Sequence, residues 1–185
     1  TQKLAQSLFE AGLITYHRTD NPNLSDDGIA AIGAYAEGQG WQLSEKKRRW
    51  PLPEGAQEAH EAIRPTHVED REAGEDDKQK ALYRLIWQRA VASQLADAVY
   101  KTVTLDLAAD AGGERFHFRA RSAELVKQGW RIVAADEKSD DEDEDESTNG
   151  RVPMLQPGTS VTATGGKILR KATKPPRRYT CLLYT

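Results

Sequence analysis

The sequence predicts an α+β protein in which a mostly helical first part is followed by a part rich in β-strand. Up to about residue 100, apolar side chains recur every three or four residues, which is the period of an amphipathic helix. After Tyr100 they alternate with polar side chains, as in a strand with one buried face. We therefore expect two domains, residues 1–100 and residues 101–185, with an acidic loop at residues 136–150 in the second.

The first two helices are expected early in the chain. Residues 3–10 read as a helix that stops at Gly12, and residues 13–16 then run extended. Ser25 is a suitable N-cap for a second helix, because its hydroxyl can accept a hydrogen bond from a free backbone N–H. The buried stripe of this helix should contain Ile29, Ile32, Tyr35 and Ala36.

The strongest helical pattern covers residues 76–100. Its apolar residues recur at intervals of three and four, which predicts a long amphipathic helix that serves as the packing spine of the first domain. The side chains expected on its buried side are Leu82, Leu85, Ile86, Ala90, Val91 and Leu95.

Strands are expected in the second part. Residues 103–107 and 116–120 would pair across a turn at residues 110–113, and residues 130–134 would add a third strand. Two short strands, residues 152–155 and 160–163, would be joined by a turn at Pro157-Gly158. The second strand alternates apolar residues with basic ones, so one of its sides is either solvated or lines a polyanion; these residues are Arg115, His117, Arg119 and Arg121.

The net charge of −3 conceals a basic body. Residues 136–146 contain nine acids and one lysine, and the rest of the chain carries 25 bases against 20 acids, a net charge of +5. A basic body favours a polyanionic partner.

No apolar run approaches the roughly 18 residues that span a bilayer. The single cysteine, Cys181, excludes an internal disulfide. We expect a soluble, intracellular chain.

Tyr16 is the first candidate for chemistry. Free tyrosine has a pKa near ~10, so its oxygen is a weak nucleophile unless a nearby cation favours the phenolate. Arg18, two residues further on, could supply that charge and steady a phosphate. The alternative is a half-buried tyrosine at a strand end with a surface arginine beside it.

Two further groups are candidates for binding. The basic cluster, defined as Lys46, Lys47, Arg48 and Arg49, precedes Trp50; it suits single-stranded nucleic acid, or it is a solvated loop. His60 and Arg64 are four residues apart, so on a helical turn they would share a face. A lone histidine is more often structural than catalytic. The segment lacks the second histidine of a zinc-protease motif, so no metal is expected there.

Several stretches together resemble the type IA DNA topoisomerases, in particular bacterial topoisomerase I. GLITYHRTD at residues 12–20 is similar to the family's active-site tyrosine motif, and AHEAIRPT at residues 59–66 is similar to its second signature. The resemblance runs from Leu4 to Thr180. Two positions depart from the family's usual residues: His17 stands where methionine or proline is usual, and Asn21 where serine is common. Residues 181–185 do not continue the family pattern.

The resemblance implies an enzyme that cleaves one DNA strand through a 5′-phosphotyrosine, passes a strand through the gap and religates it, without ATP. Tyr16 would be the nucleophile, with Arg18 and His60 beside the scissile phosphate. The expected DNA contacts are Arg64, Lys46, Lys47, Arg48, Arg49, Arg115, Arg119 and Arg121.

The resemblance also implies a fold and partners. A mostly helical, CAP/winged-helix-like tyrosine domain would be followed by part of the β-rich arch of a toroid. Mg²⁺ would be bound by a Toprim domain that this chain lacks, so the chain alone would bind single-stranded DNA without cleaving it. A monomer in the bacterial cytoplasm, at the nucleoid and away from membranes, is expected. The alternatives are a fragment of reverse gyrase or topoisomerase III, or a non-catalytic DNA-binding module on the same scaffold.

Overall fold

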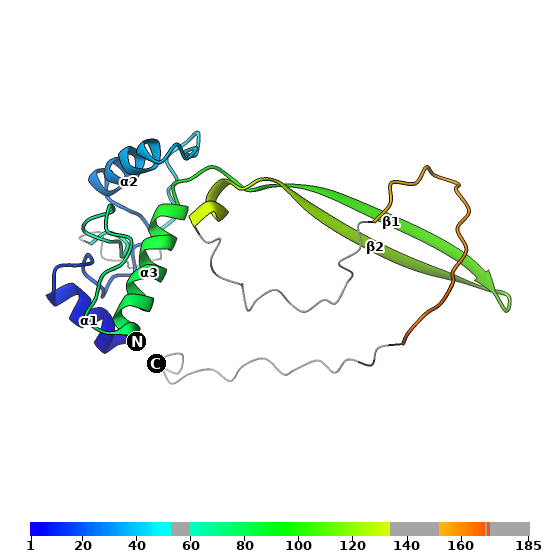
Figure 1. Cartoon of the computed structure of the whole chain (residues 1–185), viewed down its shortest axis with the longest axis horizontal. Coiled ribbons are helices and arrows are strands. Elements are labelled where there is room, and N and C mark those ends of the chain that lie inside the picture. Colours follow the sequence, from blue (N-terminus) through cyan, green and yellow to red (C-terminus); the bar gives the residue numbers. More distant parts are fainter. Residues whose placement is uncertain (53–59, 134–151, 169, 171–185) are drawn as a thin grey trace. The chain divides into compact units, whose positions relative to one another are not determined.

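A computed structural model of the chain describes residues 1–52, 60–133, 152–168 and 170. The chain forms two units, Thr1–Pro153 and Met154–Thr185, and each is described by itself. Within its described residues, the first unit holds helices and one antiparallel hairpin (Figure 1). The predicted α+β class is confirmed. The elements are α1 (Gln2–Glu10), α2 (Asp26–Gly38), α3 (Asp77–Ala92), β1 (Val99–Ala111), β2 (Glu114–Lys127) and the 3₁₀ helix η1 (Gly129–Val133).

The end of α1 sets the direction of the segment that carries Tyr16. Gly12 adopts a positive φ of 72°, and its N–H donates to the carbonyl of Phe9. The N–H of Leu13 donates to the carbonyl of Leu8 at 2.9 Å. These two bonds form a Schellman motif, in which glycine allows the chain to turn sharply away from the helix. The predicted stop at Gly12 is confirmed.

The caps of α2 and α3 also follow from sequence. The Ser25 hydroxyl accepts a hydrogen bond from the Gly28 N–H at 3.1 Å, as predicted for the N-cap of α2. Asp76 caps α3 in the same way, since its Oδ1 accepts from the Gln79 N–H at 2.7 Å. On α2 the predicted residues Ile29, Ile32 and Ala36 are buried, and Tyr35 is half-buried.

The predicted core face of α3 is confirmed only in part: Ala90, Val91 and Leu95 are buried as expected, and Leu82 and Ile86 are partly buried. Leu85 is 40% exposed, whereas Tyr83 and Trp87 are 1% and 4% exposed. The two aromatic rings bury more area than leucines would, and they turn the helix so that polar Gln79 and Gln88 are also buried. The helix ends at Ala92 and not near Tyr100. Beyond it, Leu95 forms an isolated antiparallel bridge with Leu43.

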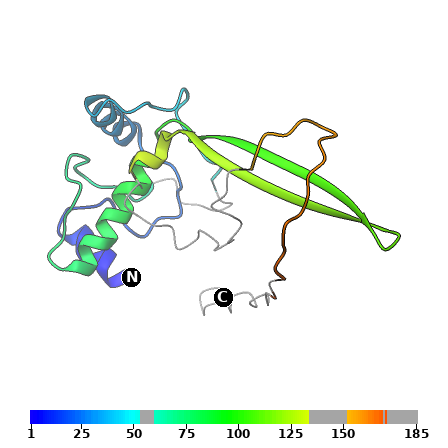
Figure 2. The same cartoon turned by 45° about the vertical axis from the view of Figure 1, so that its right-hand side comes forward.

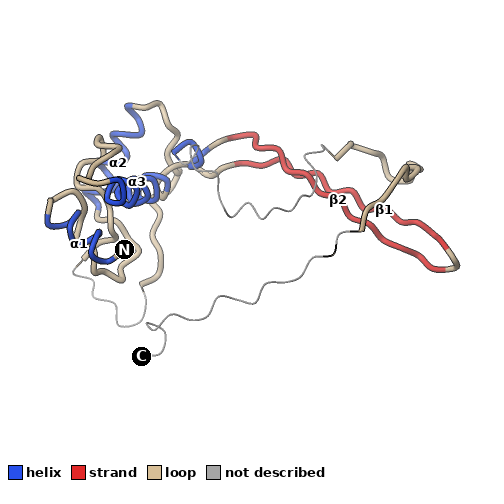
Figure 3. The backbone as a smooth tube through the Cα atoms, turned by 60° about the horizontal axis from the view of Figure 1, so that its bottom comes forward, coloured by secondary structure: helices blue, strands red, loops and turns tan. Residues whose placement is uncertain are grey.

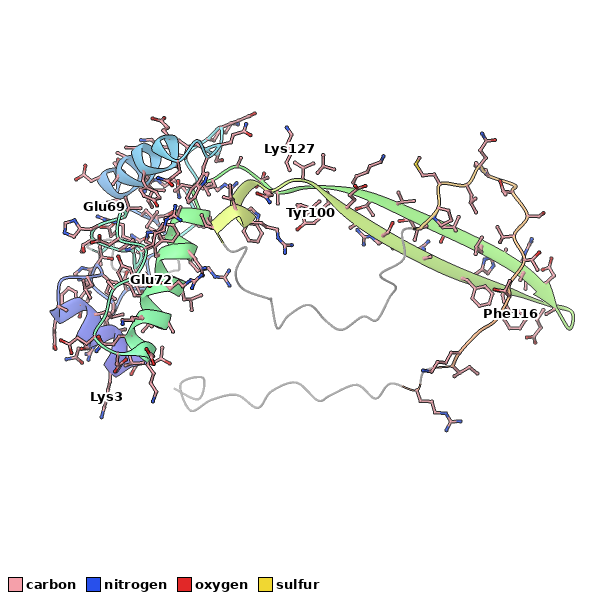
Figure 4. All side chains as sticks on the ribbon, in the orientation of Figure 1. Lys3, Glu69, Glu72, Tyr100, Phe116 and Lys127 are labelled. Atoms are coloured by element: carbon pink, nitrogen blue, oxygen red, sulfur yellow. The ribbon has the colours of Figure 1, made fainter. Side chains whose placement is uncertain are left out.

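The hairpin is longer than predicted. β1 and β2 pair in antiparallel register around Gly112 and Gly113, whose φ values of 61° and 85° suit a two-residue turn (Figures 1 and 3). The apolar face predicted for the second strand is present but largely open: Phe116 and Phe118 are 44% and 59% exposed. Phe116 lies near the turn, far from Tyr100 (Figure 4).

Three other predicted strands are wrong. Residues 129–133 form η1 at the end of β2, next to α3, where the Trp130 N–H donates to the Ala96 carbonyl at 2.8 Å (Figure 2). Residues 152–155 and 160–163 form no strand in the described part of the chain, where no neighbour pairs with them. The turn at Pro157-Gly158 is confirmed, and the Thr159 N–H donates to the Gln156 carbonyl.

Some predictions fall outside the described residues. These are Ala134, the acidic loop at residues 136–150 and Cys181. The change of sequence period coincides with the start of β1 at Val99, and the domain boundary near Tyr100 stays a prediction. None of the described helices combines the length and the apolar character needed to cross a membrane.

Candidate active site

The two sequence motifs lie side by side in the structure. Ile14 forms an antiparallel bridge with Pro65, the Thr15 N–H donates to the Arg64 carbonyl at 2.9 Å, and the Thr66 N–H donates to the Leu13 carbonyl at 3.1 Å. The segment after α1 is therefore joined to the segment after His60 like two short strands. Ile14 is 1% exposed, so this junction lies in the core.

The side chain of Thr15 strengthens the junction. Its Oγ1 accepts from the Arg64 N–H at 3.0 Å and donates to the Ala62 carbonyl at 3.2 Å. A threonine hydroxyl can act as donor and acceptor at once, so this single side chain holds two points of the second motif. The next residue is Tyr16, whose position is therefore tied to that motif.

Tyr16 is half-buried among other rings. Its ring centroid lies 4.6 Å from that of His60, with the planes tilted by 40°. Phe9 of α1 meets it edge-on at 5.3 Å, and His17 lies 5.6 Å away. The structure thus brings together the two predicted residues Tyr16 and His60, which are far apart in sequence.

His17 and Arg18, the two residues after Tyr16, differ in their exposure and contacts. The Arg18 side chain is exposed, and its guanidinium forms no hydrogen bond or ion pair with the described residues. Nδ1 of His17 is buried and has no hydrogen-bond partner within the described part of the chain. Arg18 is therefore available to a ligand, and the His17 ring packs against Phe9 and Tyr16.

Asn21 holds His60 in place, a role that the sequence did not predict. Its Nδ2 donates to the His60 carbonyl at 2.8 Å, and its Oδ1 accepts from the Asn23 N–H at 2.9 Å. Asn21-Pro22-Asn23 signals a turn, and an asparagine in a turn often bonds to backbone nearby in sequence. The bond to His60 spans 39 residues, so no local pattern could reveal it.

Arg64 uses its side chain inside the protein. Its Nε and Nη2 donate to the two carboxylate oxygens of Glu61, each at 2.9 Å, and its Nη1 donates to the Pro65 carbonyl. The two side chains are only 17% and 21% exposed. Burial raises the pKa of Glu61, but hydrogen bonds from Arg64 and Ser25 and the charge of Arg64 outweigh it, so the pKa lies below its ordinary value of 4.5.

The basic cluster divides into two arginines with internal partners and two exposed lysines. Arg48 donates to the Leu95 carbonyl and to Asp97, and Arg49 donates to the Leu24 carbonyl and to Asp26. Nζ of Lys47 lies 3.4 Å from Asp26 as a loose surface pair. Lys46 is exposed and forms no ion pair with the described residues.

Trp50 has a fixed backbone and an exposed ring. Asn23 accepts from the Trp50 N–H at 2.7 Å and donates to its carbonyl at 2.9 Å. The Trp50 side chain remains 41% exposed. An open, polar-lined pocket of about 330 Å³ lies beside His60; its described lining residues are Asn21, Asn23, Leu24, Ser25, Arg49, His60 and Glu61.

On the hairpin, two of the three predicted arginines face carboxylates of the other strand. Arg119 binds Asp106 at 2.6 Å, and Arg115 lies 3.4 Å from Asp110. The hydrogen bond from Arg119 holds the pKa of Asp106 below its ordinary value. Arg121 stands opposite Thr104. This face of the hairpin is therefore less cationic than the sequence of one strand indicates.

The described residues offer no site for Mg²⁺. In no place do they gather three or more histidine, cysteine, aspartate or glutamate side chains that could hold a metal ion. Glu61, the acid closest in sequence to His60, is bound to Arg64.

Comparisons with known proteins identify the family of the chain. The family profile described as DNA topoisomerase matches residues 1–181. The plasmid DNA topoisomerase I of Xylella fastidiosa (strain 9a5c) is 45% identical over 179 residues, which cover 95% of this chain and 27% of that protein. Full-length topoisomerase I from Thermotoga maritima aligns with a TM-score of 0.60 and 27% identity, over 84% of this chain and 25% of that one. The chain spans about a quarter of the length of these relatives and belongs to the type IA DNA topoisomerase family.

Proposed function

We propose that this chain supplies the nucleophilic tyrosine of an enzyme that cleaves one DNA strand, passes a strand through the gap and religates it, thereby relaxing negative supercoils. The observation that carries the proposal is the contact between the rings of Tyr16 and His60, which are 44 residues apart in sequence. Each of these residues lies in one of the two motifs of a chain that belongs to this family. In this proposal residues 1–100 form the tyrosine domain, and residues 101–185 belong to the β-rich arch.

The chemistry follows from the residues around Tyr16. Its phenolic oxygen attacks the phosphorus, an O–P bond forms, and the bond from phosphorus to the 3′-oxygen breaks. The phenol loses its proton, the 3′-oxygen gains one, and a 5′-phosphotyrosine and a free 3′-hydroxyl result. Religation is the reverse reaction. One phosphate ester replaces another, so no ATP is needed. Arg18 and His60 would stabilise the negative charge that develops on the phosphate oxygens.

Single-stranded DNA is the substrate that best fits the exposed groups. The pocket beside His60, the exposed ring of Trp50 and the ammonium groups of Lys46 and Lys47 offer a stacking surface and phosphate partners. Arg18 and Arg121 would add further contacts. Arg48, Arg49, Arg115 and Arg119 already hold carboxylates, so we expect them to contribute less to phosphate binding.

The whole protein would act as a monomer in the cytoplasm, at the nucleoid. Mg²⁺ would be held by a Toprim domain outside this chain. The 185-residue chain alone is expected to bind single strands without cleaving them. Mg²⁺-dependent nicking of single-stranded DNA by this chain would contradict that expectation.

The decisive test is Tyr16→Phe in the longer protein that contains this chain. Removal of the phenolic oxygen should abolish the covalent protein–DNA adduct and DNA relaxation, while single-strand binding stays within about twofold, because the ring contacts remain. The adduct is measured by denaturing gel after a detergent stop. If relaxation persisted, Tyr16 would not be the nucleophile, and a non-catalytic DNA-binding role would be favoured.

A further inference from the structure

We propose that Arg64 and Glu61 are positioning residues: together they complete the N-terminal cap of α2 and thereby hold His60 against Tyr16. The proposal rests on the proposed function only in taking Tyr16 and His60 as the reacting pair. It gives Arg64 a different role from the DNA contact that the sequence predicts. Four observations lead to it.

The first observation is a cap assembled from two distant parts of the chain. In a capping box, the N-cap hydroxyl bonds the N–H of the third helical residue, whose own carboxylate reaches back to the N-cap N–H. In α2 the Ser25 hydroxyl accepts from Gly28, but Gly28 has no side chain to return the bond. Glu61 takes that place, since its Oε2 accepts from the Ser25 N–H at 2.8 Å.

The second observation is the space above Gly28. A Cβ at this position would lie 2.5 Å from Nε of Arg64 and 2.9 Å from its Cδ. The Arg64 side chain therefore crosses the first turn of α2 where any other residue would project. A larger residue at position 28 would force the Arg64 side chain to shift from this path, whereas the backbone of Gly28 is not in the positive-φ region.

The third observation is the balance of charge. The Glu61 carboxylate and the Arg64 guanidinium share two hydrogen bonds at 2.9 Å and are mostly buried. If Arg64 turned outward to a phosphate, Glu61 would be left as a buried carboxylate without its cation, which is unfavourable. The pair is therefore more stable as an internal clamp than as a DNA contact.

The fourth observation is the link to the reacting pair. Glu61 follows His60 directly, and the Arg64 backbone is bonded in both directions to Thr15, which precedes Tyr16. The clamp, which is the pair of Glu61 and Arg64, thus fixes the residue next to His60 and the residue next to Tyr16. With α2 as the common support, it sets the 4.6 Å separation between the rings of Tyr16 and His60.

The test measures the environment of the His60 ring by proton NMR in this 185-residue chain. Tyr16→Leu removes the ring next to His60. The chemical shift of His60 in this variant is the reference value without the ring current of Tyr16. In Gly28→Ala and in Glu61→Gln, the His60 signal should move most of the way to that reference. Gly33→Ala is the matched control on the same helix, since its Cβ would meet only Leu43 Cδ1 at an ordinary 3.7 Å; it should leave the signal unchanged.

A double-mutant cycle shows whether Gly28 acts through Arg64. Arg64→Ala removes the side chain that the new Cβ would displace, so Gly28→Ala should have no further effect on the His60 signal in that background. Arg64→Ala should also leave the salt dependence of single-strand binding unchanged, whereas loss of a phosphate contact would lower the slope by about 0.7. An unmoved His60 signal in folded Gly28→Ala and Glu61→Gln, or a lowered slope, would overturn the proposal.

These outcomes are separate from the test of function. The NMR signal reports the position of His60 whether or not Tyr16 forms a covalent adduct. If Tyr16→Phe kept full relaxation activity while Gly28→Ala moved the His60 signal, the proposed chemistry would fail and the clamp would stand. If Tyr16→Phe abolished relaxation while Gly28→Ala left the His60 signal unchanged, the proposed chemistry would stand and the clamp would fail.

Discussion

Two tyrosines of the first unit, Tyr16 and Tyr83, lie in different surroundings. Tyr83 is 1% exposed, and its hydroxyl donates to the Asp70 carbonyl at 2.8 Å and to the His67 carbonyl at 3.3 Å. Tyr16 is half-buried between aromatic rings, and none of the described residues binds its hydroxyl. The Tyr83 hydroxyl is held by backbone carbonyls and serves packing, whereas the Tyr16 hydroxyl has no partner among the described residues and remains open to a ligand.

Tyr83 gives a prediction on pH. Burial raises its pKa to about 12, and the negative charges of Asp70 and Glu69 add to the effect. Because this folded-state pKa lies above the ordinary value of 10, the stabilisation is complete below pH 10 and is lost as the pH rises to about 12. The free energy of unfolding should fall by up to about 3 kcal/mol over this range.

The measurement is urea denaturation between pH 9 and pH 12, at about one-unit steps. Tyr83→Phe should remove most of the fall, because phenylalanine cannot ionise. Tyr100→Phe, which changes an exposed tyrosine, should keep it. An equal fall in Tyr83→Phe and in the unaltered protein would show that other groups cause it.

At the scale of elements, α3 supports the first unit through its cap and its aromatic face. Asp76 accepts from the Gln79 N–H, and Trp87 donates its indole N–H to the Val68 carbonyl at 2.7 Å. Arg71 lies over the rings of Tyr35, Trp41 and Trp87 at 5.4 to 5.9 Å, which joins the segment before α3 to α2. Loss of the cap should therefore weaken the whole unit.

Asp76→Ala should lower the free energy of unfolding by about 1 kcal/mol, since it leaves a helix N–H without its acceptor. Asp76→Asn keeps an acceptor oxygen and is the matched control; it should retain most of the stability. Thermal unfolding followed by circular dichroism distinguishes the two. Equal destabilisation by both variants would indicate that the charge of Asp76, and not its hydrogen bond, stabilises α3.

The sequence predicted the positions of helices and of the hairpin better than it predicted which side of a helix is buried. Ser25, Gly12 and the change of period near Tyr100 act locally, so the caps, the stop and the hairpin were predictable. The face of α3 was predictable only in part: Ala90 and Val91 are buried as expected, but leucine and tyrosine fit the same helical period, and only packing decides which of them is buried. The strand predicted at residues 130–134 failed because a short apolar run pairs as a strand only when a neighbour is available.

The candidate site was predictable in its members more than in their roles. The two motifs indicated Tyr16 and His60, and the structure brings these two residues into contact. The roles of Asn21, Glu61 and Gly28 depend on partners 36 to 39 residues away, which no spacing rule reveals. Arg64 and the arginines of the basic cluster read as cations in sequence, but their carboxylate and carbonyl partners are visible only in the fold.

At the scale of the whole molecule, the number of basic residues overstates the charge available to DNA. Outside the acidic run the chain has a net charge of +5, yet many of its arginines are engaged in ion pairs. A paired guanidinium releases fewer counterions on binding because its charge is already balanced. The exposed lysines should therefore contribute more to the salt dependence of DNA binding than the paired arginines do.

This difference can be measured with single-stranded oligonucleotides over a range of salt concentrations. For single strands, the logarithm of the binding constant falls with the logarithm of salt concentration by about 0.7 per phosphate neutralised. Lys46→Ala, which removes an exposed ammonium that forms no ion pair with the described residues, should reduce the slope by about 0.7. Asp106→Ala combined with Arg119→Ala removes an ion pair without changing net charge, so the slope should stay the same. A larger reduction of the slope in the Asp106 and Arg119 variant would place the DNA on the hairpin instead of beside the basic cluster. Tighter binding to duplex than to single strands would contradict the proposed preference for single strands.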